Sequence, residues 1–395
     1  MKMGFRLEEE HDSKSHSSDW SCLDNDLTEL ILSYLPLRSI VRARLVCKQW
    51  NSLIAQESFA SRVSRKKKPW FFLFGQNNVF LKNNQAFGFD PESKEWIRLS
   101  SSLFPRPLRQ EDSFIGSSGF FFLTTGSTLS QFRYTPLLSD SWQFTQPLRF
   151  SRSNPLVGVF EIGGSLRFIV AGGARFIGGL VDIEERLAVE IYDCQSDSWV
   201  LCPPLPAHFR PGNSSQCLCS TLLNGKFFVF GIHSGFVSAF DLNQHLWSAV
   251  RVLKPPGVIF SFLVSCQNQL ILAGLCNNSD GPSFNLWRVD EGSMVFTDLA
   301  VMPRDLLSCL IESDEDEKFA SLKCVGLGNL IYVFNEEHHR VYPACACEIS
   351  PDLGCTWWRV PELPPPVNKF HKVIGFCSKV PLNGILGHGP KSWLL

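Results

Sequence analysis

The spacing of apolar residues along the chain changes once, near residue 66. Before that point, apolar residues recur every three or four positions, as they do on one face of a helix. The first stripe comprises Leu27, Leu30, Ile31, Tyr34 and Leu35, and the second comprises Ile40, Ala43, Cys47, Trp50 and Ile54. The pattern predicts a small all-α segment with two helical stretches, the first beginning near Asp26 and ending at Pro36.

Beyond Pro69 the apolar residues instead form short runs separated by Gly, Pro, Asn and Ser. A turn signal that contains Gly or Asn precedes most of these runs, as in Asn224–Gly225. Such dipeptides accept positive φ and are typical of β-hairpin turns. The runs are Trp70–Phe74, Phe120–Leu123, Phe168–Ala171, Phe227–Phe230, Leu270–Ala273 and Leu330–Phe334. This part of the chain is therefore predicted to be all β and antiparallel.

The β region repeats one motif, in which an apolar residue and Asp are followed six positions later by an aromatic residue. The clearest copies are Phe89–Asp90 with Trp96, Tyr192–Asp193 with Trp199, and Phe240–Asp241 with Trp247. Phe296 follows Asp290, and two looser copies lead from Tyr134 to Trp142 and from Glu348 to Trp357 and Trp358, of which Trp358 is used for the spacing. Each Asp is expected to accept backbone N–H groups in a turn, and each Trp to pack between neighbouring units.

The spacing of the six aromatic positions sets the architecture. Successive positions lie between 46 (Trp96 to Trp142) and 62 (Phe296 to Trp358) residues apart. Units of this length with four antiparallel strands are typical of β-propeller blades, so the sequence predicts six blades. The first blade is one strand short, and we expect the strand-like segment Phe370–Phe376 to complete it and close the ring.

Composition excludes several classes of protein. The 395 residues carry a formal net charge of −1, which gives no electrostatic basis for binding nucleic acid or an anionic membrane. The polar N-terminal stretch is not expected to act as a secretory signal, and no run of 18 apolar residues predicts a membrane span. The 14 cysteines are then expected to be free thiols in a reducing compartment, the cytoplasm and/or the nucleus.

The repeat resembles the kelch motif. That motif has a double Gly after a hydrophobic strand, then Tyr-Asp, then Trp. Gly172–Gly173, Tyr192–Asp193 and Trp199 match it in order. The resemblance covers roughly residues 69–385 and implies a kelch-type β-propeller whose blades are held by these residues.

The helical segment resembles an F-box. The matching residues include Leu23, Leu27, Ile31, Leu35–Pro36, Val46 and Trp50. One position departs from the family pattern, because the usual Leu-Pro opening reads Leu23–Asp24 here. The resemblance implies that these seven residues, counting Leu35 and Pro36 separately, bind a Skp1-like adaptor.

Together the two segments resemble the plant-type F-box/kelch-repeat proteins. That resemblance implies a non-catalytic receptor that joins a cullin and a RING protein through the adaptor and captures a target of unknown identity on the propeller. The predicted organisation is a disordered tail (1–19), an F-box domain (20–64), a basic linker (65–69), a propeller (70–385) and a C-terminal tail (386–395). We expect the two domains to have separate cores, so that a chain starting near residue 67 would fold alone.

Other interpretations stay open from the sequence. A scaffold that works outside a ligase is compatible with the altered opening, and some kelch-type propellers are enzymes, although no catalytic motif or cofactor fingerprint is present. His338–His339 with Cys345, Cys347 and Cys355 lack a familiar zinc spacing, so neither metal nor cofactor is expected. Asp314–Glu317 could hold Ca²⁺ but is more typical of a solvated loop. The basic segment Arg65–Lys68 is either a nuclear signal or a charged linker.

Overall fold

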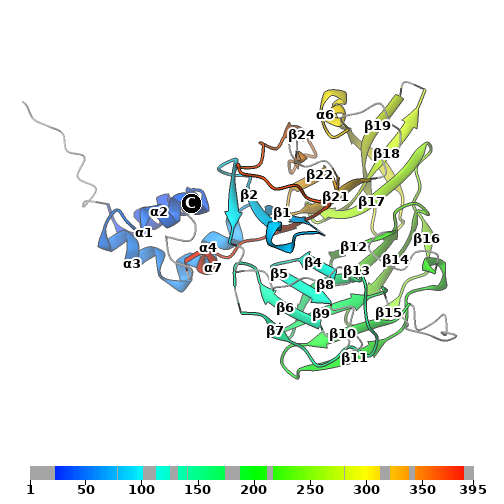
Figure 1. The fold of residues 1–395 in the computed structure, drawn as a ribbon, viewed down its shortest axis with the longest axis horizontal. Helices are drawn as coiled ribbons and strands as arrows, with labels where there is room; N and C mark the ends of the chain where they lie inside the picture. Colours follow the sequence, from blue (N-terminus) through cyan, green and yellow to red (C-terminus); the bar gives the residue numbers. More distant parts are fainter. Residues whose placement is uncertain are drawn as a thin grey trace, which may run out of the picture.

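The structure is a computed structural model in which a small helical domain sits beside a six-bladed β-propeller (Figure 1). It describes residues 23–77, 79–100, 113–124, 132–139, 141–173, 187–210, 217–279, 281–311, 321–337 and 343–386. The predicted N-terminal tail, the acidic run Asp314–Glu317 and the pair His338–His339 lie outside the described residues. None of the described helices combines the length and apolar character needed to cross a membrane.

The helical domain contains four short helices where the sequence predicted two stretches. They are α1 (Asn25–Tyr34), α2 (Leu37–Ala43), α3 (Lys48–Ile54) and α4 (Glu57–Lys66). The second apolar stripe is broken because Cys47 adopts an extended conformation and caps α3, its Sγ accepting the backbone N–H of Trp50 at 3.4 Å. The first helix was predicted to begin near Asp26, but α1 begins at Asn25. Asp24 occupies its N-cap and makes no side-chain capping bond.

The described strands form six antiparallel sheets, which confirms the predicted number of blades. From the innermost strand outward, the first three are β25 (Lys372–Ser378), β1 (Trp70–Gln76), β2 (Gln85–Asp90) and β3 (Glu95–Leu99); β4 (Ser113–Ser117), β5 (Phe120–Thr124), β6 (Phe132–Pro136) and β7 (Gln143–Phe144); and β8 (Leu156–Ile162), β9 (Ser165–Ala171), β10 (Val189–Asp193) and β11 (Ser198–Cys202).

The remaining three blades are formed by β12 (Leu218–Leu223), β13 (Lys226–Gly231) and β14 (Phe236–Asp241) with β15 (Leu246–Trp247) and β16 (Arg251–Val252); by β17 (Val258–Cys266), β18 (Gln269–Asn278), β19 (Gly281–Val289) and β20 (Phe296–Val301); and by β21 (Leu322–Leu327), β22 (Leu330–Asn335), β23 (Cys345–Ile349) and β24 (Cys355–Arg359). The other helical elements described are η2 (Leu81–Asn83), η4 (Ala207–Phe209), α6 (Arg304–Cys309) and α7 (Leu382–Leu386).

The C-terminal strand closes the ring, as the sequence predicted. β25 pairs along the whole of β1, from Trp70 opposite Ser378 to Gln76 opposite Lys372. The innermost strands then contact one another around the ring in the order β25, β4, β8, β12, β17, β21. Their close approach needs glycine, because a Cβ on Gly116 of β4 would lie 2.2 Å from the ring of Phe376 in β25.

The strand register corrects the repeat in two blades. The motif aromatic lies opposite the residue before the Asp, as Trp199 lies opposite Tyr192. In the sixth blade that position is occupied by Trp357, opposite Cys347, rather than by Trp358. In the second blade it is Gln143, opposite Tyr134, and Trp142 precedes the strand. In both blades the turn that follows the motif differs in length from the turn in the other blades. The aromatic position assigned from the sequence is therefore one residue away from the position in the structure.

The expectation of separate cores is wrong. One continuous apolar cluster contains residues of the helical domain, such as Ile40 and Val63, together with Trp70 and Phe376 of the first blade. Leu137 and Leu138, in the turn after β6, belong to the same cluster, as does Leu382 of α7. The helical domain therefore completes its interior against the propeller, because so short a segment cannot enclose a core by itself.

Candidate interaction surfaces

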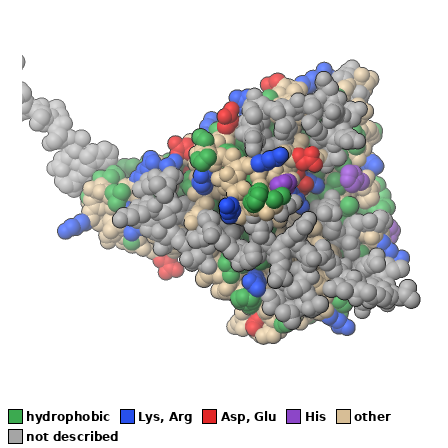
Figure 2. Space-filling view, in the orientation of Figure 1, with side chains coloured by type: hydrophobic (Ala, Val, Ile, Leu, Met, Phe, Trp, Pro, Cys, Tyr) green, Lys and Arg blue, Asp and Glu red, His purple; other side chains and the backbone are tan. Residues whose placement is uncertain are grey.

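The helical domain carries an exposed apolar face. Leu27 is 52% exposed, Tyr34 is 72% exposed and Val46 is 65% exposed, and all are large side chains whose exposure is costly in water. The whole set, called the apolar face below, is Leu27, Leu30, Ile31 and Tyr34 of α1 with Leu45 and Val46 of the turn between α2 and α3. In the space-filling view, hydrophobic and basic side chains lie next to one another over this domain (Figure 2).

The opposite side of α1 fixes this face in place. Thr28, Leu32 and Ser33 are buried, with Leu32 in the shared core. A hydrogen bond of 2.8 Å from Gln49 Nε2 to Asn25 Oδ1 ties α3 to the start of α1. The helix therefore has two apolar sides, one satisfied within the molecule and one left for solvent or a partner.

The seven residues that sequence resemblance assigned to adaptor binding are divided by the structure. Leu27, Ile31 and Val46 lie on the apolar face. Leu23, Leu35, Pro36 and Trp50 are half-buried, and both Leu35 and Trp50 pack against the shared core. Leu30, Tyr34 and Leu45 share this exposed face but were not part of that assignment, although Leu30 and Tyr34 stood in the helical stripe.

The kelch glycines form a left-handed turn that leads out of β9. Gly172 and Gly173 have φ values of 66° and 67°, and a Cβ on Gly173 would lie 2.5 Å from the carbonyl oxygen of Ser153. A side chain at Gly173 would thus be both strained and blocked, which explains the need for glycine.

A buried ion pair that the sequence did not reveal supports this turn. The guanidinium of Arg152 is fully buried, pairs with Glu190 and donates to the carbonyl oxygens of Gly172 at 2.7 Å and Ala188 at 2.8 Å. Burial lowers the pKa of Arg152, and the carboxylate of Glu190 opposes that shift. The sequence hinted at this pair only through Glu190, a charged residue that lies in β10 two residues before Tyr192.

The motif Asp side chains order turns, which is the structural role expected of them. Oδ1 of Asp90 accepts the backbone N–H of Glu92 at 2.9 Å, and Oδ1 of Asp241 accepts those of Asn243 and Gln244 at 2.9 and 2.8 Å. The hydrogen bond from Ser165 is the largest of the contributions that lower the pKa of Asp193, which also accepts from the backbone.

The motif Trp side chains join neighbouring blades through hydrogen bonds. The indole N–H of Trp199 donates to the carbonyl of Gln146 at 2.8 Å, that of Trp247 to Pro203 at 3.0 Å, and that of Trp96 to Pro361 at 2.8 Å. Each acceptor lies in the segment that follows the outer strand of the preceding blade. Trp96 is buried, whereas Trp199 and Trp247 are half-exposed, so the wedge predicted from sequence is complete only in the first blade.

The cysteines that the structure describes are free thiols. Seven of these thirteen are buried, and burial raises the pKa of Cys266 and Cys345 to about 12. Cys345 and Cys347 are buried within the sixth blade. Within the described residues, no group of three or more His, Cys, Asp or Glu side chains is placed to hold a metal ion.

Comparison with known proteins agrees with this geometry. Residues 20–62 match the F-box domain family. An F-box/kelch-repeat protein of Arabidopsis thaliana is 29% identical over 375 residues, covering 91% of this chain and 90% of the relative. A second such protein of A. thaliana is 22% identical over 365 residues, covering 71% of this chain and 64% of its own.

A further relative and a solved structure extend the comparison. F-box only protein 6 of A. thaliana is 23% identical over 361 residues, covering 85% of this chain and 70% of that protein. A crystal structure of a Bacteroides caccae protein of unknown function covers 79% of this chain and 98% of its own, at 10% identity and a TM-score of 0.44, a likeness too low to bear on function. The chain thus carries an F-box domain ahead of a kelch-type six-bladed propeller and is similar along most of its length to plant F-box/kelch-repeat proteins.

Proposed function

We propose that this chain is the substrate-recognition subunit of an SCF-type ubiquitin ligase. The apolar face binds a Skp1-like adaptor, which links the chain to a cullin and a RING protein, and the propeller binds the protein to be ubiquitinated. In this role the chain performs no chemistry itself and works in the cytoplasm or the nucleus, where such ligases meet their targets.

The observation that carries the proposal is the apolar face within the F-box match. Six large hydrophobic side chains are exposed on one short helix and one turn, while other apolar residues of the domain, such as Leu32, Ile40 and Val63, are buried in the core shared with the propeller. Burying such side chains in a partner gains about 1.5–3 kcal/mol for each one that becomes fully covered. An apolar helix face that docks into a groove is one of the recurring ways in which proteins recognise a partner.

A direct test uses the full chain and a purified Skp1-like adaptor. We expect the wild-type chain and the adaptor to elute together as a 1:1 complex in gel filtration. A chain with Leu27→Asp and Ile31→Asp should elute alone, because two carboxylates would be buried in the contact. Elution of the wild-type chain without any adaptor would exclude the ligase role and favour a scaffold that retains the F-box sequence.

The propeller half of the proposal has its own test in cells. The Leu27→Asp, Ile31→Asp chain should still hold its target but no longer deliver it for ubiquitination. Proteins that both co-purify with this variant and rise in abundance when it is expressed are the expected targets. Complex formation with the adaptor but no change in any bound protein would indicate assembly without degradation.

A further inference from the structure

The last described helix of the chain belongs to the helical domain, although it follows the propeller in sequence. α7 packs on α4 and α2. Leu382 is fully buried and Ile385 is 4% exposed, and both lie in the shared core with Leu37 and Ile40 of α2. About 320 residues separate Leu382 from its neighbours on α4. Segments that lie before and after the propeller in sequence therefore build one core, and Figure 1 shows α7 beside α4.

A polar contact fixes the position of α7 on α4. The hydroxyl of Ser64 donates to the carbonyl of Ala60 at 2.8 Å and accepts the backbone N–H of Leu382 at 3.0 Å. The hydroxyl thus gives the first N–H of α7 a partner, which the helix itself cannot supply. The contact specifies one register between the two helices rather than a general apolar association.

The segment between α4 and β1 is also held rather than free. Lys67 is buried, and its Nζ lies 2.9 Å from Oε2 of Glu92 in the turn between β2 and β3. The backbone N–H of Lys68 donates to Oε1 of the same Glu92 at 3.3 Å. The Nζ of Lys68 reaches Glu348, which also accepts from Asn329 at 2.7 Å.

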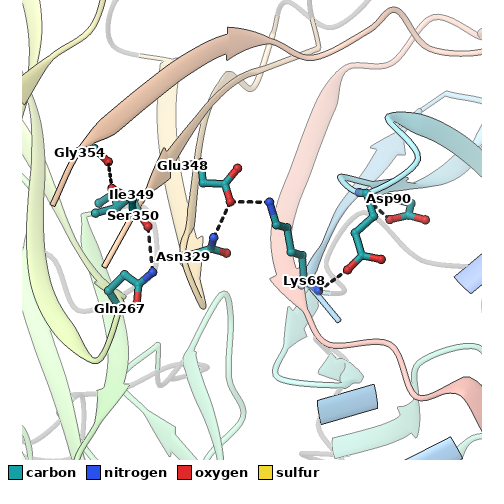
Figure 3. Close-up of polar contacts among 9 residues, drawn as sticks. Lys68, Asp90, Gln267, Asn329, Glu348, Ile349, Ser350 and Gly354 are labelled. Carbon is teal, nitrogen blue, oxygen red and sulfur yellow. Dashed lines mark hydrogen bonds and ion pairs between the residues drawn. The ribbon is translucent and has the colours of Figure 1, made fainter. Parts of the chain in front are cut away.

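These contacts join the segment to two blades. Figure 3 shows Lys68 between Glu348 of the sixth blade on one side and the Asp90 turn of the first blade on the other. A charged linker that tethered two independent domains would instead stay in solvent. Two of the four cations in Arg65–Lys68 therefore serve the junction.

We propose that α7 and the residues Lys67 and Lys68 form a brace that fixes the orientation of the helical domain on the propeller. The chain then acts as one rigid arm rather than as two domains on a flexible link. The helical domain contacts the propeller through the Leu137–Leu138 turn and the segment after β25. Both belong to the face that carries the turns between β4 and β5 and between β2 and β3.

The functional consequence rests on the proposed adaptor binding. A fixed orientation holds the adaptor on that side of the ring. The opposite face carries the described connections that lead from an outer strand to the next blade, such as residues 145–155 and 360–371. That face is then presented away from the adaptor, and it is the one we assign to the target.

Limited digestion of the full chain with trypsin tests the brace, because Arg65, Lys66 and Lys67 are cleavage sites only when the end of α4 opens. Leu382→Asp places a charge in the shared core, and we expect cleavage at this junction to accelerate about tenfold or more. Asn383→Asp adds the same charge at the next position, which is exposed, and should leave the rate unchanged.

Ile385→Ala provides a milder variant should Leu382→Asp fail to accumulate as folded protein, and about a threefold acceleration is expected for it. Equal cleavage rates in the wild-type, Ile385→Ala and Leu382→Asp chains would overturn the brace. So would cleavage of the wild-type chain at the rate of an unstructured peptide. Adaptor is absent from this assay, so its result is independent of whether the adaptor binds.

Discussion

The helical domain and the propeller treat their apolar residues differently. The propeller places its aromatic residues between blades, where Phe71 stacks on Tyr332 with ring centroids 4.6 Å apart. The helical domain buries one side of α1 in the shared core and leaves the other side exposed. A ring of blades can satisfy itself by closure, whereas four short helices cannot. The uncovered apolar residues of the helical domain are therefore best explained by a partner.

The largest expected effect on stability lies within the propeller, at its buried ion pair. Arg152→Ala leaves the carboxylate of Glu190 buried without its partner, and we expect a loss of about 3–5 kcal/mol in the free energy of unfolding. Arg167→Ala is the matched control in the same blade, since the ion pair of Arg167 with Asp193 is partly exposed and should contribute under about 1 kcal/mol. Urea denaturation measures both, and equal losses would contradict the structural role of Arg152.

The motif Trp residues give losses of stability that are as large or smaller, and these losses rank the blades by the burial of the Trp. Trp96→Ala should cost about 3–5 kcal/mol, as large aromatic truncations in cores do. Trp199→Ala should cost less, about 1–3 kcal/mol, because its indole is half-exposed and mainly loses one hydrogen bond and two ring contacts. Thermal unfolding of the two variants gives the order, and a larger loss at Trp199 would contradict the ranking of the blades by the burial of the motif Trp.

The smallest loss of stability is expected on the apolar face. Two positions of α1, one on each side of the helix, allow the buried and the exposed side to be compared directly. Leu32→Ala should destabilise the chain by about 2–4 kcal/mol, because Leu32 is fully buried in the shared core. Leu27→Ala, five residues earlier on the exposed side, should change the free energy of unfolding by less than about 0.5 kcal/mol. A comparable loss at both positions, measured by urea denaturation, would mean that Leu27 serves the fold rather than a partner.

Periodicity in the sequence was enough to predict the architecture, but it was not enough to predict the contacts between the helical domain and the propeller. The hairpin runs and the Asp-to-Trp spacing predicted six blades and the closing strand, because both depend on local turn chemistry. The shared core could not be predicted, since it joins Leu382 to residues more than 300 positions away, and nothing local marks Leu382 as helical-domain core. The pair of Arg152 and Glu190, 38 residues apart, was missed because the sequence does not show which two charged side chains meet inside a blade.

The candidate site was only partly readable for a different reason. The stripe on α1 combined Leu35, which packs on the core, with Leu27, Ile31 and Tyr34, which do not. A helical period identifies apolar positions but not which side meets the protein's own interior. The packing of the whole domain decides that, and it leaves Leu35 and Trp50 half-buried against the shared core rather than freely exposed.

The affinity of the full chain for a purified Skp1-like adaptor tests the central claim most directly. Calorimetry would compare three chains: the wild type, the variant with Leu27→Asp and Ile31→Asp, and a control with Val200→Asp and Leu201→Asp. The control changes residues of the propeller rim that are 50% and 49% exposed, close to the exposure of Leu27 and Ile31. We predict equal binding by the wild type and the control, and binding weaker by about 10³-fold in the face variant, from two losses of about 2 kcal/mol each. Equal affinity of all three chains, or no binding by the wild type, would contradict the account.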